Sequence, residues 1–333
     1  MVKKGLLTFP SLPSIVATGV TAGPLEKKSP FHSHFDKIYD DESCDAKTNE
    51  HGHAKLMEDA CMIALSKLGK VPSDADFFLV GDLVNQMTPS NFTATSIGIP
   101  YIGVFAACAT SVSSMLLAAL LTESGMSQLT IAGSASQHNA IERQFRYPIE
   151  YGAQKGETAQ WTATAAGIAA ITPHRNGVPS IVCGTFGKAV DMGMTDPLNM
   201  GAAMAPAAAD TLKRHLEGHN KQVSDYDCIM TGDLGKNGFA IFIKLVQNQG
   251  ITNIDNFSDA GMEFYGKNPD FMAGASGAGC SAAVYLSEVY AKLLSKEYKK
   301  VLLIATGALL SPMSFQQGDT IPSIAHAIEL TMK

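Results

Sequence analysis

A repeat with a constant spacing constrains this sequence more than any other feature. Residues 73–83 read Ser-Asp-Ala-Asp, a short apolar run and Gly-Asp-Leu, and residues 224–234 repeat the pattern with Tyr in place of Ala. The offset is 151 residues, since 224 minus 73 and 233 minus 82 both give this number. Each copy predicts a helix, an acidic turn, a buried parallel strand and a polar loop at the strand's carboxyl end. We therefore expect two related α/β halves.

The repeat continues downstream at a larger offset. Cys108 begins a predicted helix that leads to a strand at 129–132, and Cys280 does the same before a strand at 301–305. The cysteines are 172 residues apart, so the second half holds about twenty more residues in the intervening loop. We predict one half at residues 1–175 and the other at 176–333, with a ligand cleft between them where the parallel strands end.

Composition excludes several classes of protein. With 333 residues, 46% hydrophobic and 17% charged, the chain can bury a large core. A net charge of -6 gives no basic surface for nucleic acid. The sequence shows neither a signal peptide nor an apolar run of membrane-spanning length, and its six cysteines lack CxxC spacing. We expect a globular protein that is soluble or at most peripheral to a membrane.

Cys108 is the candidate nucleophile. It follows an apolar stretch and two alanines and precedes the helical pattern 112–121. A thiol at a helix N-terminus is favoured as thiolate, which is how catalytic cysteines are activated. The alternative is a buried structural cysteine among small residues.

These motifs resemble known proteins. Residues 79–135 resemble the thiolase and ketoacyl synthase superfamily, whose nucleophile lies in an Ala-Cys loop before a buried helix. Longer strings, spread almost end to end, are similar to the stage V sporulation protein AD family of endospore-forming bacteria; they lie at 21–24, 34–37, 81–86, 138–140, 142–148, 205–211 and 305–312. The resemblance implies a thiolase-like fold with two pseudo-symmetric halves, each a mixed β-sheet flanked by helices, layered α/β/α/β/α.

The sequence departs from the superfamily at the catalytic positions. Superfamily enzymes carry a His in the second Gly-Asp-Leu loop and a His or Asn in a later Gly-rich loop. Here these loops are 231–235 and 274–280, and neither contains His or Asn. Because acyl transfer needs a base and oxyanion donors, we predict no catalytic residue and interpret Cys108 as vestigial. The alternative is a condensing enzyme or acyltransferase that uses Cys108, with Cys280 or Asp233 in support.

The family resemblance implies binding instead of catalysis. Similar proteins bind dipicolinic acid (pyridine-2,6-dicarboxylate), free or as calcium dipicolinate, and support its uptake into the developing spore with other SpoVA membrane proteins. It also implies a homodimer, located in the cytoplasm or peripherally on the forespore or spore inner membrane, with no cofactor. A third possibility is a structural component whose surface docks partners and whose cleft is vestigial.

A planar dianion calls for guanidinium and ammonium donors and a flat apolar wall. The segment 138–155 concentrates such groups in an otherwise acidic chain. A dimer interface is an equally good interpretation for its arginines, and capping of a loop is the better one for Asp82. With these alternatives open, the predicted ligand-binding residues are Cys108, His138, Arg143, Arg146, Lys155 and Asp82.

Four histidines lie between Pro30 and Lys55, at positions 32, 34, 51 and 53. No carboxylate or cysteine joins them in a recognised ligand order. We interpret this stretch as a solvated excursion over the cleft and predict no metal site.

Overall fold

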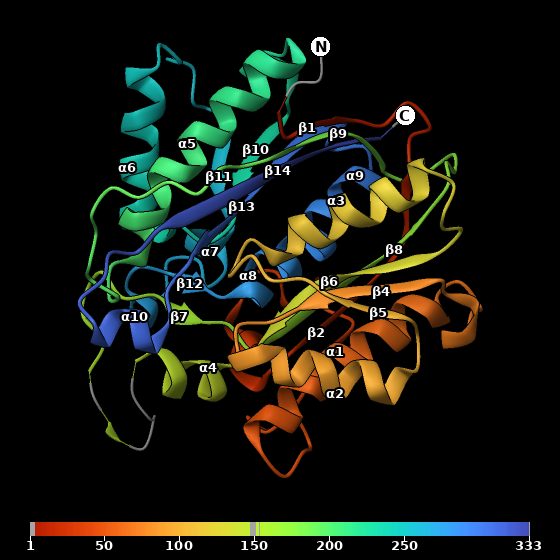
Figure 1. The fold of residues 1–333 in the computed structure, drawn as a ribbon, viewed down its shortest axis with the longest axis horizontal. Helices are drawn as coiled ribbons and strands as arrows, with labels where there is room; N and C mark the ends of the chain where they lie inside the picture. Colours follow the sequence, from red (N-terminus) through yellow and green to blue (C-terminus); the bar gives the residue numbers. More distant parts are fainter. Residues whose placement is uncertain (1–3, 147–150, 153, 333) are drawn as a thin grey trace.

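The computed structural model describes residues 4–146, 151–152 and 154–332. Ten strands form two sets of five that meet where Ser14 pairs with Ser180 (Figure 1). The first set, in spatial order, is β2 (Ser14–Ala22), β8 (Ala165–Thr172), β6 (Thr130–Ser136), β4 (Phe77–Gly81) and β5 (Tyr101–Gly103). The second is β9 (Ser180–Phe186), β14 (Ser323–Thr331), β13 (Lys300–Ala308), β10 (Cys228–Thr231) and β11 (Phe257–Asp259).

The two sets have the same topology. In each, three strands run parallel at the outer edge, and the two strands nearest the junction are antiparallel to their neighbours. Short strands complete the sheets: β1 (Leu6–Thr8) on β9, β3 (Lys37–Ile38) on β2, and β7 (Trp161–Thr162) paired with β12 (Ala275–Ser276). The predicted pseudo-symmetric fold is confirmed. The division at residue 175 falls in the β8–β9 connection and, as a domain boundary, stays a prediction.

Helices form three layers around the two strand sets. Helix α1 (Asn49–Ser66) covers the first set, and α5 (Met200–His219) covers the second. Between the sets lie α3 (Thr110–Glu123), which packs on strands of both, and α8 (Ala278–Val284), which continues through a π-helical turn into α9 (Tyr290–Leu294). The remaining helices are α2 (Thr88–Ile97), α4 (His138–Phe145), α6 (Gly235–Asn248), α7 (Ala260–Glu263) and α10 (Pro312–Gln316).

The repeated aspartates explain why the two halves share a sequence pattern. Asp76, at the start of β4, accepts hydrogen bonds from the backbone N–H groups of Gln128 and Leu129 before β6. Asp227 accepts the same pair of bonds from Lys299 and Lys300 at the start of β13. A carboxylate that accepts from two otherwise unpaired backbone N–H groups fixes the register of neighbouring parallel strands. The motif is therefore a structural device used twice.

Two local predictions were wrong. Neither cysteine begins its helix: α3 begins at Thr110, two residues after Cys108, and α8 begins at Ala278, two residues before Cys280, which is completely buried. The solvated stretch ends at Thr48, whose hydroxyl accepts from the His51 N–H and caps α1. The side chain of His53 is therefore inside the core rather than in solvent, because it falls on the buried face of that helix.

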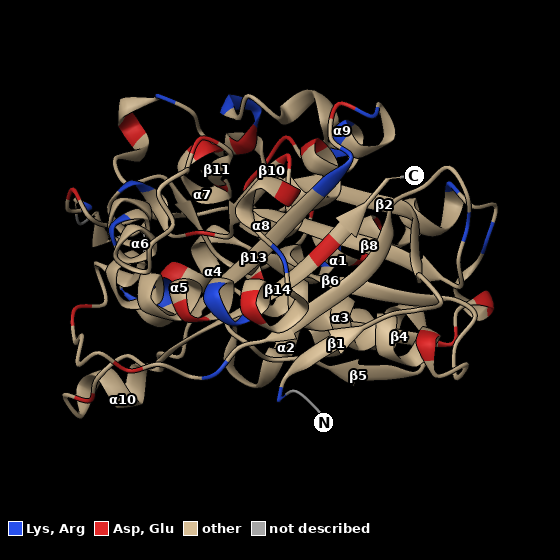
Figure 2. Cartoon of the chain, turned by 90° about the horizontal axis from the view of Figure 1, so that it is seen from above, with Lys and Arg blue, Asp and Glu red and all other residues tan. Residues whose placement is uncertain are grey.

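Charged residues lie mainly at the periphery. Figure 2 shows acidic and basic residues interspersed over the outer helices and loops. By sequence, α3 contains a single charged residue and α8 contains none. Among the described residues, no helix combines the length and the apolar character needed to cross a bilayer.

Candidate functional site

A pocket beside Cys108 takes side chains from both halves at the carboxyl ends of β4 and β13. Ten of its lining residues offer only apolar surface or backbone: Leu83, Phe105, Ala107, Ile141, Phe145, Met200, Met204, Gly277, Ala308 and Leu310. Six bring polar side chains: Cys108, Arg146, Gln160, Thr162, Asp233 and Ser276. An apolar wall with a few convergent polar groups is typical of a small-molecule site, but the free volume is only about 40 Å³, so side chains must move apart to admit a ligand.

The backbone around Cys108 is held in an uncommon conformation. Ala107 has φ of 49°, in the left-handed region. The Thr110 hydroxyl donates to the Ala107 carbonyl at 2.6 Å and accepts from the Ala106 N–H at 3.1 Å, which fixes this turn before α3. The half-buried Cys108 side chain thereby lines the pocket.

The thiol of Cys108 is held in its neutral form. Burial raises its pKa well above the usual value, and the charge of Asp233 and the hydrogen bond that the thiol donates to it act in the same direction. The N–H of Gly277 opposes this shift without reversing it. A protonated thiol is a weak nucleophile, so Cys108 would have to lose its proton before it could attack a thioester.

Asp233 stands in the loop where superfamily enzymes carry a histidine. Its carboxylate accepts from the Thr306 hydroxyl at 2.8 Å and from the Gly277 N–H at 3.0 Å. Burial raises its pKa to about 7, against the opposing effect of these hydrogen bonds and that from Cys108. Gln160 donates to the Asp233 carbonyl at 2.7 Å and so anchors the loop. The site therefore holds an acid that ionises near neutral pH.

Arg146 brings a buried positive charge to the pocket. Its side chain is only 4% exposed and pairs with Glu142, which is fully buried. Lys155 binds the same carboxylate oxygen at 2.8 Å. Two cations and one anion leave a surplus positive charge at the wall, and Nε of Arg146 has no hydrogen-bond partner in the described part of the chain. A negatively charged ligand in the pocket would balance the surplus charge.

The titration of this group follows from burial and mutual charge. Burial alone would raise the pKa of Glu142, but Arg146, Lys155 and His138 outweigh it and lower that pKa to about 2. Burial and the charge of Arg146 lower the pKa of Lys155 to about 8, despite the attraction of Glu142. At neutral pH Glu142 is therefore ionised and Lys155 is mostly protonated.

His138 lies behind the pocket rather than on its wall. Its ring stacks on Trp161 with centroids 4.3 Å apart, and its Nδ1 lies 2.9 Å from the Thr162 carbonyl. Nζ of Lys155 lies over the Trp161 ring, 4.8 Å from its centroid. Burial lowers the pKa of His138 to about 4, so the imidazole is neutral at pH 7.

Arg143 and Asp82 lie outside the pocket lining. Arg143 is half exposed and pairs with Glu50 on α1. The Asp82 carboxylate accepts from the Val84 N–H at 2.7 Å and the Ser90 N–H at 2.9 Å, where it caps its loop and the start of α2. The structure thus brings Cys108 and Arg146 together in one pocket. Lys155 is connected to Arg146 through Glu142, and His138 is connected to Lys155 through Trp161. Arg143 and Asp82 lie apart from this group.

Sequence reasoning missed Glu142, Gln160 and the methionines of α5 as members of the site. Glu142 is spaced i,i+4 from Arg146 within the same predicted segment, and this spacing was the available signal. The two methionines could not be distinguished from core residues, because the second half approaches the first only in the fold.

The neutral state of Cys108 gives a first test. Iodoacetamide at pH 7.5 is expected to label it at least about tenfold more slowly than an unperturbed thiol, because so little thiolate is present. Intact-mass measurement over time, followed by peptide mapping, gives the rate. Stoichiometric labelling of Cys108 within the time that free cysteine needs would contradict the protonated state.

Comparison with known structures identifies the fold. Human mitochondrial 3-ketoacyl-CoA thiolase aligns with TM-score 0.61 and 12% identity over 97% of this chain and 99% of its own. 3-Oxoacyl-[acyl-carrier-protein] synthase III from Aquifex aeolicus aligns with TM-score 0.58 and 12% identity over 96% and 99% of the two chains. Both names describe enzymes, and at this identity the likeness shows the thiolase-like fold alone.

Comparison with sequences identifies the family. The family model for "Stage V sporulation protein AD (SpoVAD)" matches residues 3–331. Stage V sporulation protein AD of Bacillus subtilis (strain 168) is 41% identical over 312 residues, which are 94% of this chain and 92% of that protein. The chain therefore belongs to the stage V sporulation protein AD family and is a sporulation protein.

Proposed function

We propose that this chain is a non-catalytic binding protein that holds dipicolinate, free or as its calcium chelate, in the Cys108 pocket. The observation that carries the proposal is the buried Arg146 side chain, which lines a largely apolar pocket and brings a positive charge to it. A guanidinium is a fork-shaped donor suited to a carboxylate. The phenyl and aliphatic wall suits the pyridine ring.

The charges around the pocket support an anionic ligand. The cluster of Glu142, Arg146 and Lys155 carries one surplus positive charge, and the neutral thiol of Cys108 adds no negative one. Asp233 can also become neutral, because its pKa lies at about 7. A dianion entering here would be attracted rather than repelled.

Isothermal titration of the full chain with dipicolinate tests this function. Benzoate is the control, because it has one carboxylate and no ring nitrogen. Saturable heat with dipicolinate and little with benzoate supports the proposal, and parallel titrations with and without Ca²⁺ show whether the chelate binds better. Equal heats for the two ligands would count against it.

The titration of Asp233 predicts a pH dependence. Below about pH 7 its carboxyl is mostly protonated, and above it the group is a carboxylate beside the ligand. The ligand's own carboxylates stay ionised throughout. The dissociation constant is therefore expected to rise roughly tenfold from pH 6 to pH 8. The variant Asp233→Asn, titrated in parallel, should keep only about a twofold rise, because Lys155, with a pKa of about 8, loses half of its charge by pH 8; an unchanged tenfold slope would show that Asp233 is not the group that titrates.

The same Asp233 favours one alternative, acyl transfer. A carboxylate that accepts from the thiol could serve as its base, although the raised pKa of Cys108 opposes thiolate formation. Incubation with acyl-coenzyme A of several chain lengths and intact-mass measurement decides between the two. A mass increase lost in Cys108→Ser would support catalysis, and an unchanged mass would support binding alone.

We also propose that the protein acts as a homodimer with other SpoVA membrane proteins at the forespore or spore inner membrane. Support for self-association comes from the edge strand β5, where Ile102 on the strand and Phe105 two residues after it are 45% and 54% exposed. Apolar side chains at a free sheet edge favour pairing with another chain.

A further inference from the structure

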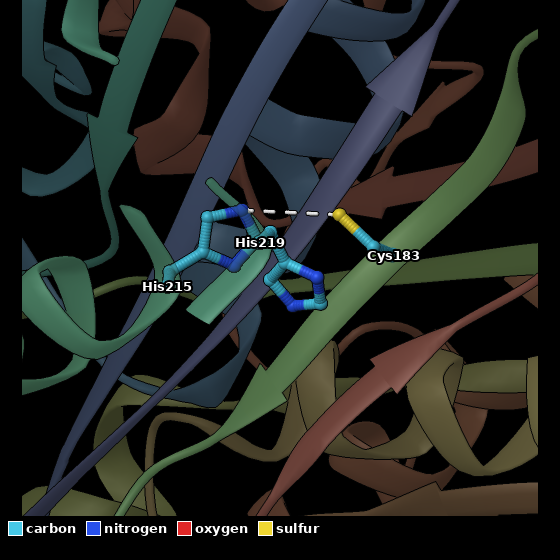
Figure 3. Close-up of side chains that lie close together, drawn as sticks. All are labelled: Cys183, His215 and His219. Carbon is cyan, nitrogen blue, oxygen red and sulfur yellow. Dashed lines mark hydrogen bonds between the residues drawn. The ribbon is translucent and has the colours of Figure 1, made fainter. Parts of the chain in front are cut away.

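A second group of reactive side chains lies in the other half of the molecule, away from the Cys108 pocket. Cys183 comes from β9, and His215 and His219 come from one face of α5 (Figure 3). A ligand atom of each lies within 4.8 Å of those of the other two. None of the three lines the Cys108 pocket.

The spacing suits coordination of one ion. His215 and His219 are four residues apart, so they share one helix face. Nε2 of His215 lies 3.9 Å from Sγ of Cys183. This is a long hydrogen bond, but it is close to the distance of about 3.6 Å that separates a sulfur and a nitrogen bound to one tetrahedral Zn²⁺. His219 is only partly buried, and the separations within the group are at most 4.8 Å.

Glu329, on the neighbouring strand, is the candidate for a fourth donor: its carboxylate lies beside Cys183 but outside the group of three whose ligand atoms are all within 4.8 Å of one another. It is paired with Cys183 in the β14–β9 register and is 1% exposed. Its Oε2 lies 3.5 Å from the sulfur, while Oε1 is held 3.4 Å from Nζ of Lys221. One carboxylate oxygen therefore faces the cluster, and the other is neutralised by a cation outside it. Thiolate, two imidazoles and a carboxylate form a closed tetrahedral ligand set.

Both histidines are oriented as metal ligands are. Nδ1 of His215 lies 2.9 Å from the Thr185 hydroxyl, and Nε2 of His219 lies 3.1 Å from the Gly184 carbonyl. Fixing one ring nitrogen in this way directs the other nitrogen of each ring to the metal. The Tyr226 hydroxyl donates to Glu329 and also lies 3.2 Å from Nε2 of His215, so an ion would replace the latter contact.

We propose that Cys183, His215, His219 and Glu329 bind one divalent cation of borderline softness, of which Zn²⁺ fits best. Binding releases the Cys183 proton to solvent, so the ion, thiolate and carboxylate together carry no net charge. The four side chains come from α5, β9 and β14, and the ion ties the outer helix of the second half to its sheet. With all four positions filled by protein, the site is structural and has no open position for a substrate.

Titration of the metal-stripped full chain with Co²⁺ tests the site. A tetrahedral ion bound through a thiolate gives visible ligand-field bands and a near-ultraviolet sulfur-to-metal charge-transfer band, and Zn²⁺ should abolish both. Cys183→Ser is expected to lose the charge-transfer band, and His219→Ala to bind Zn²⁺ at least about tenfold more weakly. Cys228→Ser is the matched control, because it alters another buried cysteine outside the cluster and should leave both signals unchanged.

Near-ultraviolet circular dichroism of each variant shows whether it keeps the fold. His219 is the more tolerant position because it is partly exposed. A folded wild-type chain with no stoichiometric Co²⁺ signal would overturn the proposal and leave the cluster as a hydrogen-bond network only. An undiminished charge-transfer band in Cys183→Ser would overturn it equally.

Discussion

Arg146→Gln is expected to weaken dipicolinate binding by about a hundredfold. The substitution removes the buried guanidinium that faces the pocket and with it the surplus positive charge, since Glu142 and Lys155 then balance. Loss of a buried charge partner for a carboxylate typically costs 2–5 kcal/mol, and about 2.7 kcal/mol corresponds to a hundredfold change. Isothermal titration at pH 6.5, where Asp233 is mostly protonated, gives the cleanest comparison.

Arg143→Gln is the matched control for this variant. Arg143 lies on α4, three residues before Arg146, which caps the end of that helix. The side chain of Arg143 is half exposed and pairs with Glu50 outside the pocket. Its replacement should change the affinity less than about threefold, because an exposed charge is screened. Equal losses in the two variants would mean that general positive charge attracts the ligand, and no loss in either would place the ligand elsewhere.

The fold could be predicted because its determinants are local and repeated. Asp76 and Asp227 each tie a strand start to its parallel neighbour, so the same residues recur at the same offset. The strands predicted at 129–132 and 301–305 correspond to β6 (Thr130–Ser136) and β13 (Lys300–Ala308). Both strands are longer in the structure than the sequence predicted. Antiparallel β8 left no such signature, because its alanine-rich buried run fits helix or strand equally well.

The site was harder to predict, because chain proximity does not determine which way a helix presents its side chains. His138, Arg143 and Arg146 lie on the same short helix or at its end, yet one stacks behind the pocket, one faces α1 and one enters the pocket. The pseudo-symmetric pair Asp82 and Asp233 also diverged. Asp82 caps a loop. Asp233 lies beside Cys108, because the Gly-rich loop of the second half folds over it and the Gly277 N–H donates to its carboxylate.

Glu142→Gln is expected to lower the free energy of unfolding by about 3–5 kcal/mol at pH 7. The glutamate carboxylate is fully buried and binds Arg146, Lys155 and the Thr162 hydroxyl. The substitution leaves two buried cations without their anion, and the loss of one partner from a buried pair is strongly destabilising. Urea unfolding followed by circular dichroism measures the change. The double variant with Arg146→Gln should recover part of the loss, because only one cation then remains.

Acid titration separates this ion cluster from ordinary surface pairs. Because the folded-state pKa of Glu142 is about 2, below its usual value of 4.5, its contribution is complete above pH 4.5 and disappears as the pH falls toward 2. The shift corresponds to about 3 kcal/mol, so wild type should lose that much stability over this interval while Glu142→Gln loses far less. Glu50→Gln breaks the neighbouring half-exposed pair and should cost at most about 1 kcal/mol. If the two glutamine variants unfold at the same urea concentration, the cluster around Glu142 is no more strongly coupled than an ordinary surface pair.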